Sequence, residues 1–91
     1  MEFNAIWVDD CKAAPEDCAV ARTYDDALRM LRKYRYTILY LDFDLGDEGS
    51  KTGLDLLRQL KAEKICPALV ICISWNLVGR KQIEAEINDV E

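Results

Sequence analysis

The chain has 91 residues, of which 51% are hydrophobic, so one domain with its own core is expected over residues 1–91. The formal net charge is −5, from 12 basic and 17 acidic residues, which argues against nucleic-acid binding because that function needs clustered Lys and Arg. Apolar runs long enough for a membrane span or a signal peptide are lacking, so we predict a cytoplasmic protein.

The composition also limits the possible chemistry. The chain contains no histidine, which removes the commonest general acid or base and any Ser-His or Cys-His nucleophile pair. Its cysteines, at positions 11, 18, 66 and 72, include no pair at the two-residue spacing of a zinc or redox motif. We therefore expect reduced thiols rather than a zinc site or a disulfide framework.

The first part of the chain predicts two strands. Residues 4–8, NAIWV, are an apolar run that ends in Asp9 and Asp10, as expected for a buried strand followed by two carboxylates. Residues 12–17 contain Pro15 and are too short for a crossover helix, so we expect a loop or a single helical turn. Residues 18–21, CAVA, then predict a second, brief strand at the sheet edge.

Helices and strands alternate in the rest of the chain. Thr23 is a predicted N-cap, and the apolar spacing from residue 24 to about residue 34 predicts an amphipathic helix. Its basic face is typical of a solvated surface, with a ligand patch as the alternative. Residues 37–41 predict a strand ending at Asp42, and residues 68–73, ALVICI, predict a strand buried on both faces. Two further helices are expected, marked by Leu54, Leu57, Leu60 and Ile65, and by Ile83, Ile87 and Val90.

This alternation predicts the fold class. Strands and helices joined by short connections form a parallel sheet with helices on both faces. Right-handed crossovers then give the strand order 2-1-3-4, with the first and third strands in the middle. We therefore expect a small α/β, flavodoxin-like, three-layer fold with four strands and no fifth strand or helix.

This topology brings acidic side chains to one crevice at the carboxyl ends of the strands. Asp9 and Asp10 follow the first strand, and Asp42 and Asp44 follow the third. Crowded carboxylates repel one another unless a cation or a proton intervenes, and Mg²⁺ or Mn²⁺ bound by Asp9, Asp10 and Asp42 would relieve this. The alternative is structural, because Asp at strand ends also begins turns and caps helices.

The crevice has two further parts. Ser74 and Asn76 follow the fourth strand and are expected to face the acids. The loop after Asp42 is acidic and rich in glycine, with Gly46, Asp47, Glu48, Gly49 and Gly53. We interpret these glycines first as turn and helix-start positions and second as a phosphate cradle, since their spacing matches no phosphate-loop motif.

Taken together, these motifs resemble the cyclic-phosphate processing receiver domain family, which is related to the receiver domains of response regulators. Residues 41–46, LDFDLG, are similar to that family's Leu-Asp-His-Asp-Leu-Gly run. Residues 73–79, ISWNLVG, are similar to its His-Ser-x-Asn-Pro-x-Gly run, and Arg22-Thr23 to its Arg-Thr helix start. Phe43 and Ile73 stand where the family has histidine.

The resemblance implies a receiver-like acidic pocket that binds a divalent metal and a phosphate-containing small molecule, and that hydrolyses or processes a cyclic phosphate ester. Asp42 and Asp44 are then the candidate catalytic residues. Ser74, Asn76 and Gly79 are the candidate phosphate-binding residues. Without an imidazole, any catalysis would depend on the metal. Ligand binding without turnover is the alternative.

A protein-interaction module without phosphotransfer is a further alternative. The fourth strand would lie at a sheet edge if no fifth strand follows, and edge strands invite pairing. Trp75, Leu77 and Val78 are apolar candidates for the same contact. We therefore predict a homodimer, or a protein partner, at the fourth strand and the last helix, although Trp75 is equally suited to capping the core.

Overall fold

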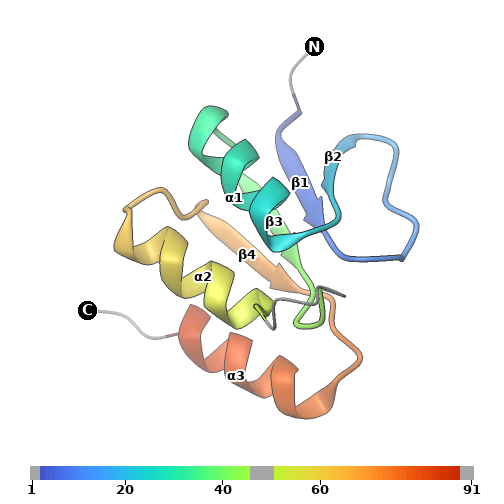
Figure 1. The fold of residues 1–91 in the computed structure, drawn as a ribbon, viewed down its shortest axis with the longest axis vertical. Coiled ribbons are helices and arrows are strands. Elements are labelled where there is room, and N and C mark those ends of the chain that lie inside the picture. Colours follow the sequence, from blue (N-terminus) through green and yellow to red (C-terminus); the bar gives the residue numbers. More distant parts are fainter. Residues whose placement is uncertain (1–2, 46–50, 89–91) are drawn as a thin grey trace.

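Figure 1 shows the computed structural model of the chain, which describes residues 3–45 and 51–88. The elements are β1 (Ala5–Val8), β2 (Cys18–Ala21), α1 (Tyr24–Lys33), β3 (Ile38–Leu41), α2 (Gly53–Ala62), β4 (Leu69–Cys72) and α3 (Leu77–Ile87). All seven were predicted from the sequence, as was a loop between β1 and β2. Most of the acidic glycine loop, residues 46–50, and Val90 lie outside the described residues.

The strands form one parallel sheet in the order β2-β1-β3-β4, which confirms the predicted topology. Val8 pairs with Ala21 on one side and with Leu41 on the other, and Leu41 pairs with Cys72. The ladder extends one step further, because the Asp42 N–H donates to the Val8 carbonyl at 3.0 Å. The strands therefore end in register at one edge of the sheet.

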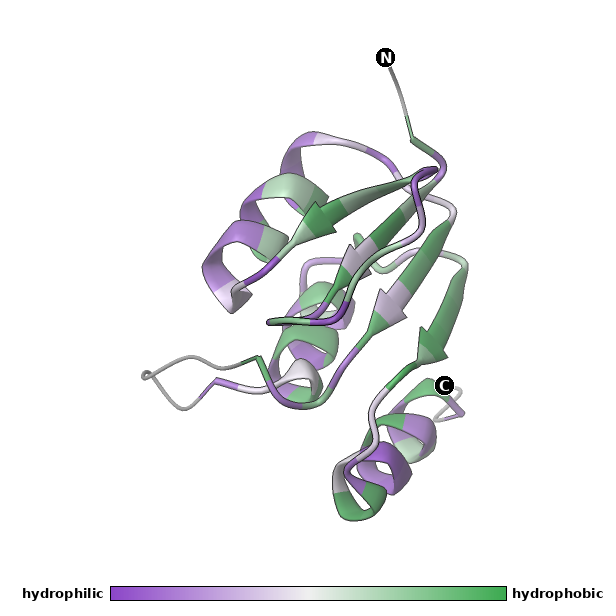
Figure 2. Cartoon of the chain, turned by 90° about the vertical axis from the view of Figure 1, so that its right-hand side faces the viewer, coloured by the Kyte–Doolittle hydropathy of each residue, from purple (hydrophilic) through white to green (hydrophobic). Residues whose placement is uncertain are grey.

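The helices lie together on one face of the sheet (Figures 1 and 2), with α1 against α2 and α2 against α3. The described residues thus form two layers, where the sequence analysis expected three. The reason lies in the connections. A loop joins β1 to β2, and the two crossovers that follow run in the same direction across the sheet. Right-handed crossovers in one direction place their helices on the same face.

Burial differs between the two faces of the sheet. Ile6 and Leu39, which face the helices, are fully buried, whereas Val20 and Leu69 on the other face are 38% and 48% exposed. The prediction that the fourth strand is buried on both faces is therefore wrong for this structure. Of its four residues, LVIC, Cys72 alone is buried.

Side-chain caps fix the helix starts at the carboxyl edge of the sheet. Thr23 accepts a hydrogen bond from the Asp26 N–H at 3.1 Å, which confirms the predicted N-cap of α1. Thr52 and Asp55 form a reciprocal capping box on α2. None of the helices in the described part of the chain is long and apolar enough to cross a membrane.

Gly53 occupies a position where a side chain does not fit. A Cβ atom there would lie 2.0 Å from the backbone oxygen of Asp42. Gly53→Ala is expected to lower the free energy of unfolding by about 1–3 kcal/mol, because α2 or the end of β3 must move. Thermal unfolding measures the loss, and the Asp42 amide NMR signal reports the displacement.

Gly79→Ala is the comparison for this prediction. Its obstacle is the Phe43 ring, 2.3 Å from an added Cβ, and a side chain moves more easily than a strand-end carbonyl. We expect Gly79→Ala to cost less than Gly53→Ala. The reverse order, or a Gly53→Ala protein as stable as wild type, would contradict this account of the packing.

Candidate functional site

Asp9 is completely buried at the end of β1. Its Oδ2 accepts hydrogen bonds from the backbone N–H groups of Cys11, at 3.2 Å, and of Lys12. A buried carboxylate needs such donors, because losing its hydration without replacement is costly. These bonds also turn the chain back directly after the strand, which brings the Lys12 side chain over the strand ends.

Lys12 lies between the two buried acids. Its Nζ is 3.4 Å from Asp9 Oδ1, 3.4 Å from Asp42 Oδ2 and 3.1 Å from the Ile73 carbonyl oxygen. The Trp75 ring centroid is 5.2 Å from the same nitrogen. Burial lowers the pKa of Lys12, but Asp42 and Asp9 outweigh burial and raise that pKa above its ordinary value. One ammonium group therefore links the ends of β1, β3 and β4.

Arg22, which follows β2, supports the loop that carries Lys12. Its Nη1 donates to the carbonyl oxygens of Lys12, at 2.6 Å, and of Asp9, at 3.3 Å. It also lies 3.9 Å from Asp9 Oδ2. Arg22 thus holds the loop backbone in the position that directs Lys12 at the acids.

Neither Lys12 nor Arg22 was predicted from the sequence to take part in the site. Lys12 is the single basic residue in residues 9–17, a loop that otherwise carries four acids. This contrast was the feature of the sequence that could have indicated its contact with the acids. For Arg22, the signal was its place directly after a strand that ends at the same sheet edge. Neither signal specifies a contact.

Asp42 is buried opposite Asp9. Burial and a hydrogen bond with Asp9 raise the pKa of Asp42 to about 6, against the lowering effects of Lys12 and of the Ser74 hydroxyl. Burial also raises the pKa of Asp9, but hydrogen bonds from Asp42 and from the Lys12 amide outweigh it and hold that pKa below its ordinary value. The two carboxyl groups thus titrate as a pair, and burial makes Asp42 the harder of the two to ionise.

The three predicted phosphate-binding residues have different surroundings. Ser74 is buried and hydrogen-bonds to Asp42, so it lies with the acids. The Asn76 side chain instead caps α3, since its Oδ1 accepts from the Gly79 N–H at 3.0 Å. Gly79 itself packs against the Phe43 ring. Asn76 and Gly79 therefore shape the end of α3 beside Ser74.

The predicted metal-binding residues Asp9, Asp10 and Asp42 are not equally available to a metal ion. The ligand atoms of Asp9, Asp10 and Cys11 lie within 4.8 Å of one another. The two carboxylates are suitable ligands for Mg²⁺ or Mn²⁺, whereas a thiol suits softer metals. The space between Asp9 and Asp42 already contains the Lys12 ammonium. Asp44 is exposed, unlike Asp42.

The predicted interface residues are all strongly exposed. Trp75, Leu77 and Val78 retain 84%, 73% and 68% of their accessible surface. Trp75 therefore does not cap the core, which was the alternative interpretation of this residue. Its ring instead lies against the ammonium of Lys12.

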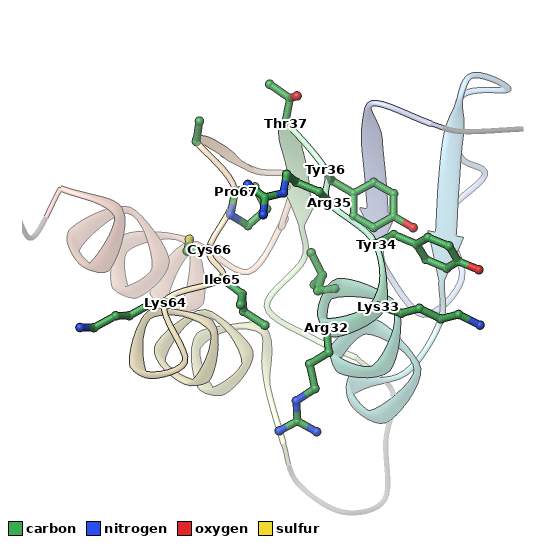
Figure 3. A pocket seen from close by; sticks show the side chains of 12 residues that line it. Arg32, Lys33, Tyr34, Arg35, Tyr36, Thr37, Lys64, Ile65, Cys66 and Pro67 are labelled. Carbon is green, nitrogen blue, oxygen red and sulfur yellow. The ribbon is translucent and has the colours of Figure 1, made fainter.

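A separate cavity of about 460 Å³ lies between the end of α1 and the segments that lead into β3 and β4 (Figure 3). Arg32, Lys33, Arg35 and Lys64 line it, and the side chains of Arg32, Lys33 and Lys64 point in different directions. Arg32 forms an ion pair with Glu63, and Lys33 lies over the Tyr34 ring. The cations do not converge on a common ligand, which favours the solvated interpretation of the basic helix face.

Comparison with known families found one family model that covers nearly the whole chain. A family model described as the cyclic-phosphate processing receiver domain matches residues 4–89. The match spans every strand and helix of the described structure. No curated protein and no solved structure matches the chain.

The buried Asp42 carboxyl is expected to cost stability at neutral pH. Its pKa rises from 3.8 in the unfolded chain to about 6 in the fold, so the folded state binds this proton more tightly. The resulting stabilisation is complete below about pH 4 and is lost as the pH rises through about 6. Asp42→Asn removes the ionisation. In metal-free buffer at pH 7, it should raise the free energy of unfolding by about 1–3 kcal/mol.

Thermal melts at pH 3.5 and pH 7 test this prediction, because the gain should shrink at the lower pH. Asp44→Asn is the matched control, since it removes an exposed carboxylate from the same loop and should leave the melting temperature unchanged. An Asp42→Asn protein that is less stable than wild type at pH 7 would contradict the prediction.

Proposed function

This chain belongs to the cyclic-phosphate processing receiver domain family, and from that premise we propose that it binds a divalent cation together with a phosphate-containing small molecule. The observation that carries the proposal is the convergence of Asp9, Asp42, Lys12 and Ser74 at the carboxyl ends of β1, β3 and β4. Acids suit the cation, whereas an ammonium and a hydroxyl suit phosphoryl oxygens.

Different residues would bind the two parts of this ligand. Asp9, Asp10 and Asp42 would hold Mg²⁺ or Mn²⁺, which would supply charge neutralisation at a phosphate. Lys12 and Ser74 carry side-chain donors that contact the acids, and they would bind phosphoryl oxygens. Asn76 positions the start of α3 beside Ser74 through its cap.

Hydrolysis of a cyclic phosphate ester is the finer part of this proposal. Opening the ring requires a proton for the departing ester oxygen and activation of the attacking water. In a chain without histidine, the carboxyl of Asp42 is well placed for proton transfer, because it contacts both Asp9 and Ser74. Asp44, exposed in the same loop, is the second candidate.

A titration followed by amide NMR tests the binding proposal. Mn²⁺ should broaden the signals around Asp9 and Asp10 first, and Mg²⁺ with inorganic phosphate should shift those of Lys12 and Ser74. Asp10→Asn removes one carboxylate ligand and should weaken metal binding by about tenfold. Turnover of cyclic phosphate esters, with Mg²⁺ and with chelator, tests catalysis separately.

Glu84→Gln is the control for the loss of one negative charge, because Glu84 is exposed on α3 and pairs with Arg80. It should bind metal as wild type does. If neither millimolar metal nor phosphate produces localised shifts, the binding proposal fails. Binding without turnover would leave a ligand-binding domain in place of an enzyme.

We also propose a second function, the pairing of this chain with another copy through β4 and α3. β4 is an edge strand whose four residues, LVIC, carry no charge. Edge strands without charges or proline are templates for pairing. The exposed side chains of Trp75, Leu77 and Val78 add apolar surface at the start of α3.

Sedimentation equilibrium tests the pairing, with a dimer as the expected result. Val78→Glu places a charge in the contact and should weaken dimerisation by at least about tenfold, without unfolding, because Val78 is exposed. Val20→Glu is the matched control at the opposite edge strand, β2, and should leave the dimer intact. A wild-type chain that stays monomeric at high concentration would exclude this function.

A further inference from the structure

Lys12 is held between the acids on several sides. An ammonium group has three hydrogen-bond donors, and here the oxygens of Asp9, Asp42 and Ile73 lie within 3.4 Å of it. The side chain is only 24% exposed. Its backbone is anchored as well, since the Lys12 carbonyl accepts from Arg22 at 2.6 Å. This is a built position for a cation rather than a transient surface contact.

The same position is the one that a divalent ion shared by Asp9 and Asp42 would need. Such an ion binds carboxylate oxygens at about 2 Å, and both carboxylates already have the Lys12 Nζ within 3.4 Å. Two positive charges a few ångströms apart in a partly buried site repel strongly. The ammonium and a divalent ion therefore compete for the acids.

We propose that Lys12 is the resident counterion of the pocket, and that it makes the pocket select a metal together with a phosphate over the metal alone. This inference rests on the proposed function of the site. A divalent ion reaches Asp42 when Lys12 leaves, and the displaced ammonium then lacks an anionic partner. A phosphate arriving with the metal supplies one, because ammonium groups bind phosphate oxygens.

The arrangement predicts a thermodynamic coupling between the two ligands. In the wild-type chain, Mg²⁺ alone binds weakly, and inorganic phosphate raises its affinity by about fivefold or more. In Lys12→Met the competing charge is gone, so Mg²⁺ alone should bind about tenfold more tightly than it does to wild type. Phosphate should no longer raise the Mg²⁺ affinity of this variant.

Calorimetric titrations of Mg²⁺, with and without inorganic phosphate, measure all four affinities. The indole N–H NMR signal of Trp75 gives an independent readout, since Lys12 lies against that ring. It should shift in the wild-type chain when both ligands are present. Lys12→Gln, which also removes the charge, repeats the test if Lys12→Met fails to fold.

Lys33→Met is the matched control. It removes the same charge and also a lysine that lies over an aromatic ring, Tyr34, at 5.4 Å, but it lines the separate cavity of Figure 3. It should behave as wild type. If Lys12→Met binds Mg²⁺ no more tightly than wild type, or keeps the phosphate coupling, this inference is overturned while the proposed function stands. If no protein binds Mg²⁺ or phosphate, both are overturned.

Discussion

The contact of Lys12 with Asp9 and Asp42 is the interaction on which the carboxyl edge of the sheet depends. Two buried carboxyl groups in contact are unfavourable unless a cation, a proton or hydrogen-bond donors offset their charges. Here the ammonium and the amides that follow Asp9 contribute at neutral pH, and a proton on Asp42 contributes below about pH 6. The sharp turn after β1 keeps that cation in place, and Arg22 supports the turn through its hydrogen bonds to the loop backbone.

The convergence of the acids was predictable, whereas the cation between them was not. Short apolar runs that end in Asp9 and Asp42 give strand ends, and parallel strands with right-handed crossovers bring those ends to one edge. That reasoning needs only residue types and order along the chain. The position of Lys12 depends on hydrogen bonds from two backbone amides to one carboxylate. No periodicity in the sequence encodes such a turn.

The described residues form one helical layer instead of two, and the residue pattern of the strands could not predict this. Trp7 is paired in register with Val20 and Tyr40, and Tyr40 with Ile71, so the four form one row across the face that the helices do not cover. The rings of Trp7 and Tyr40 lie 5.3 Å apart. The continuous apolar run of residues 68–73 predicts helices on both faces of the sheet. Such strands show that a face lacks charge, whereas the direction of the crossovers decides on which face α1 and α2 lie.

Phe43 and Ile73 contribute to the acidic site without polar side-chain groups. The Phe43 ring fills the space that a Cβ at Gly79 would need, and so packs the loop after β3 against the first turn of α3. Ile73 contributes its carbonyl oxygen, which accepts from Lys12 at 3.1 Å. Both positions thus serve packing and positioning. The polar side chains that meet at this site are therefore carboxylates, a hydroxyl and an ammonium, so any proton transfer proposed here has to use these groups.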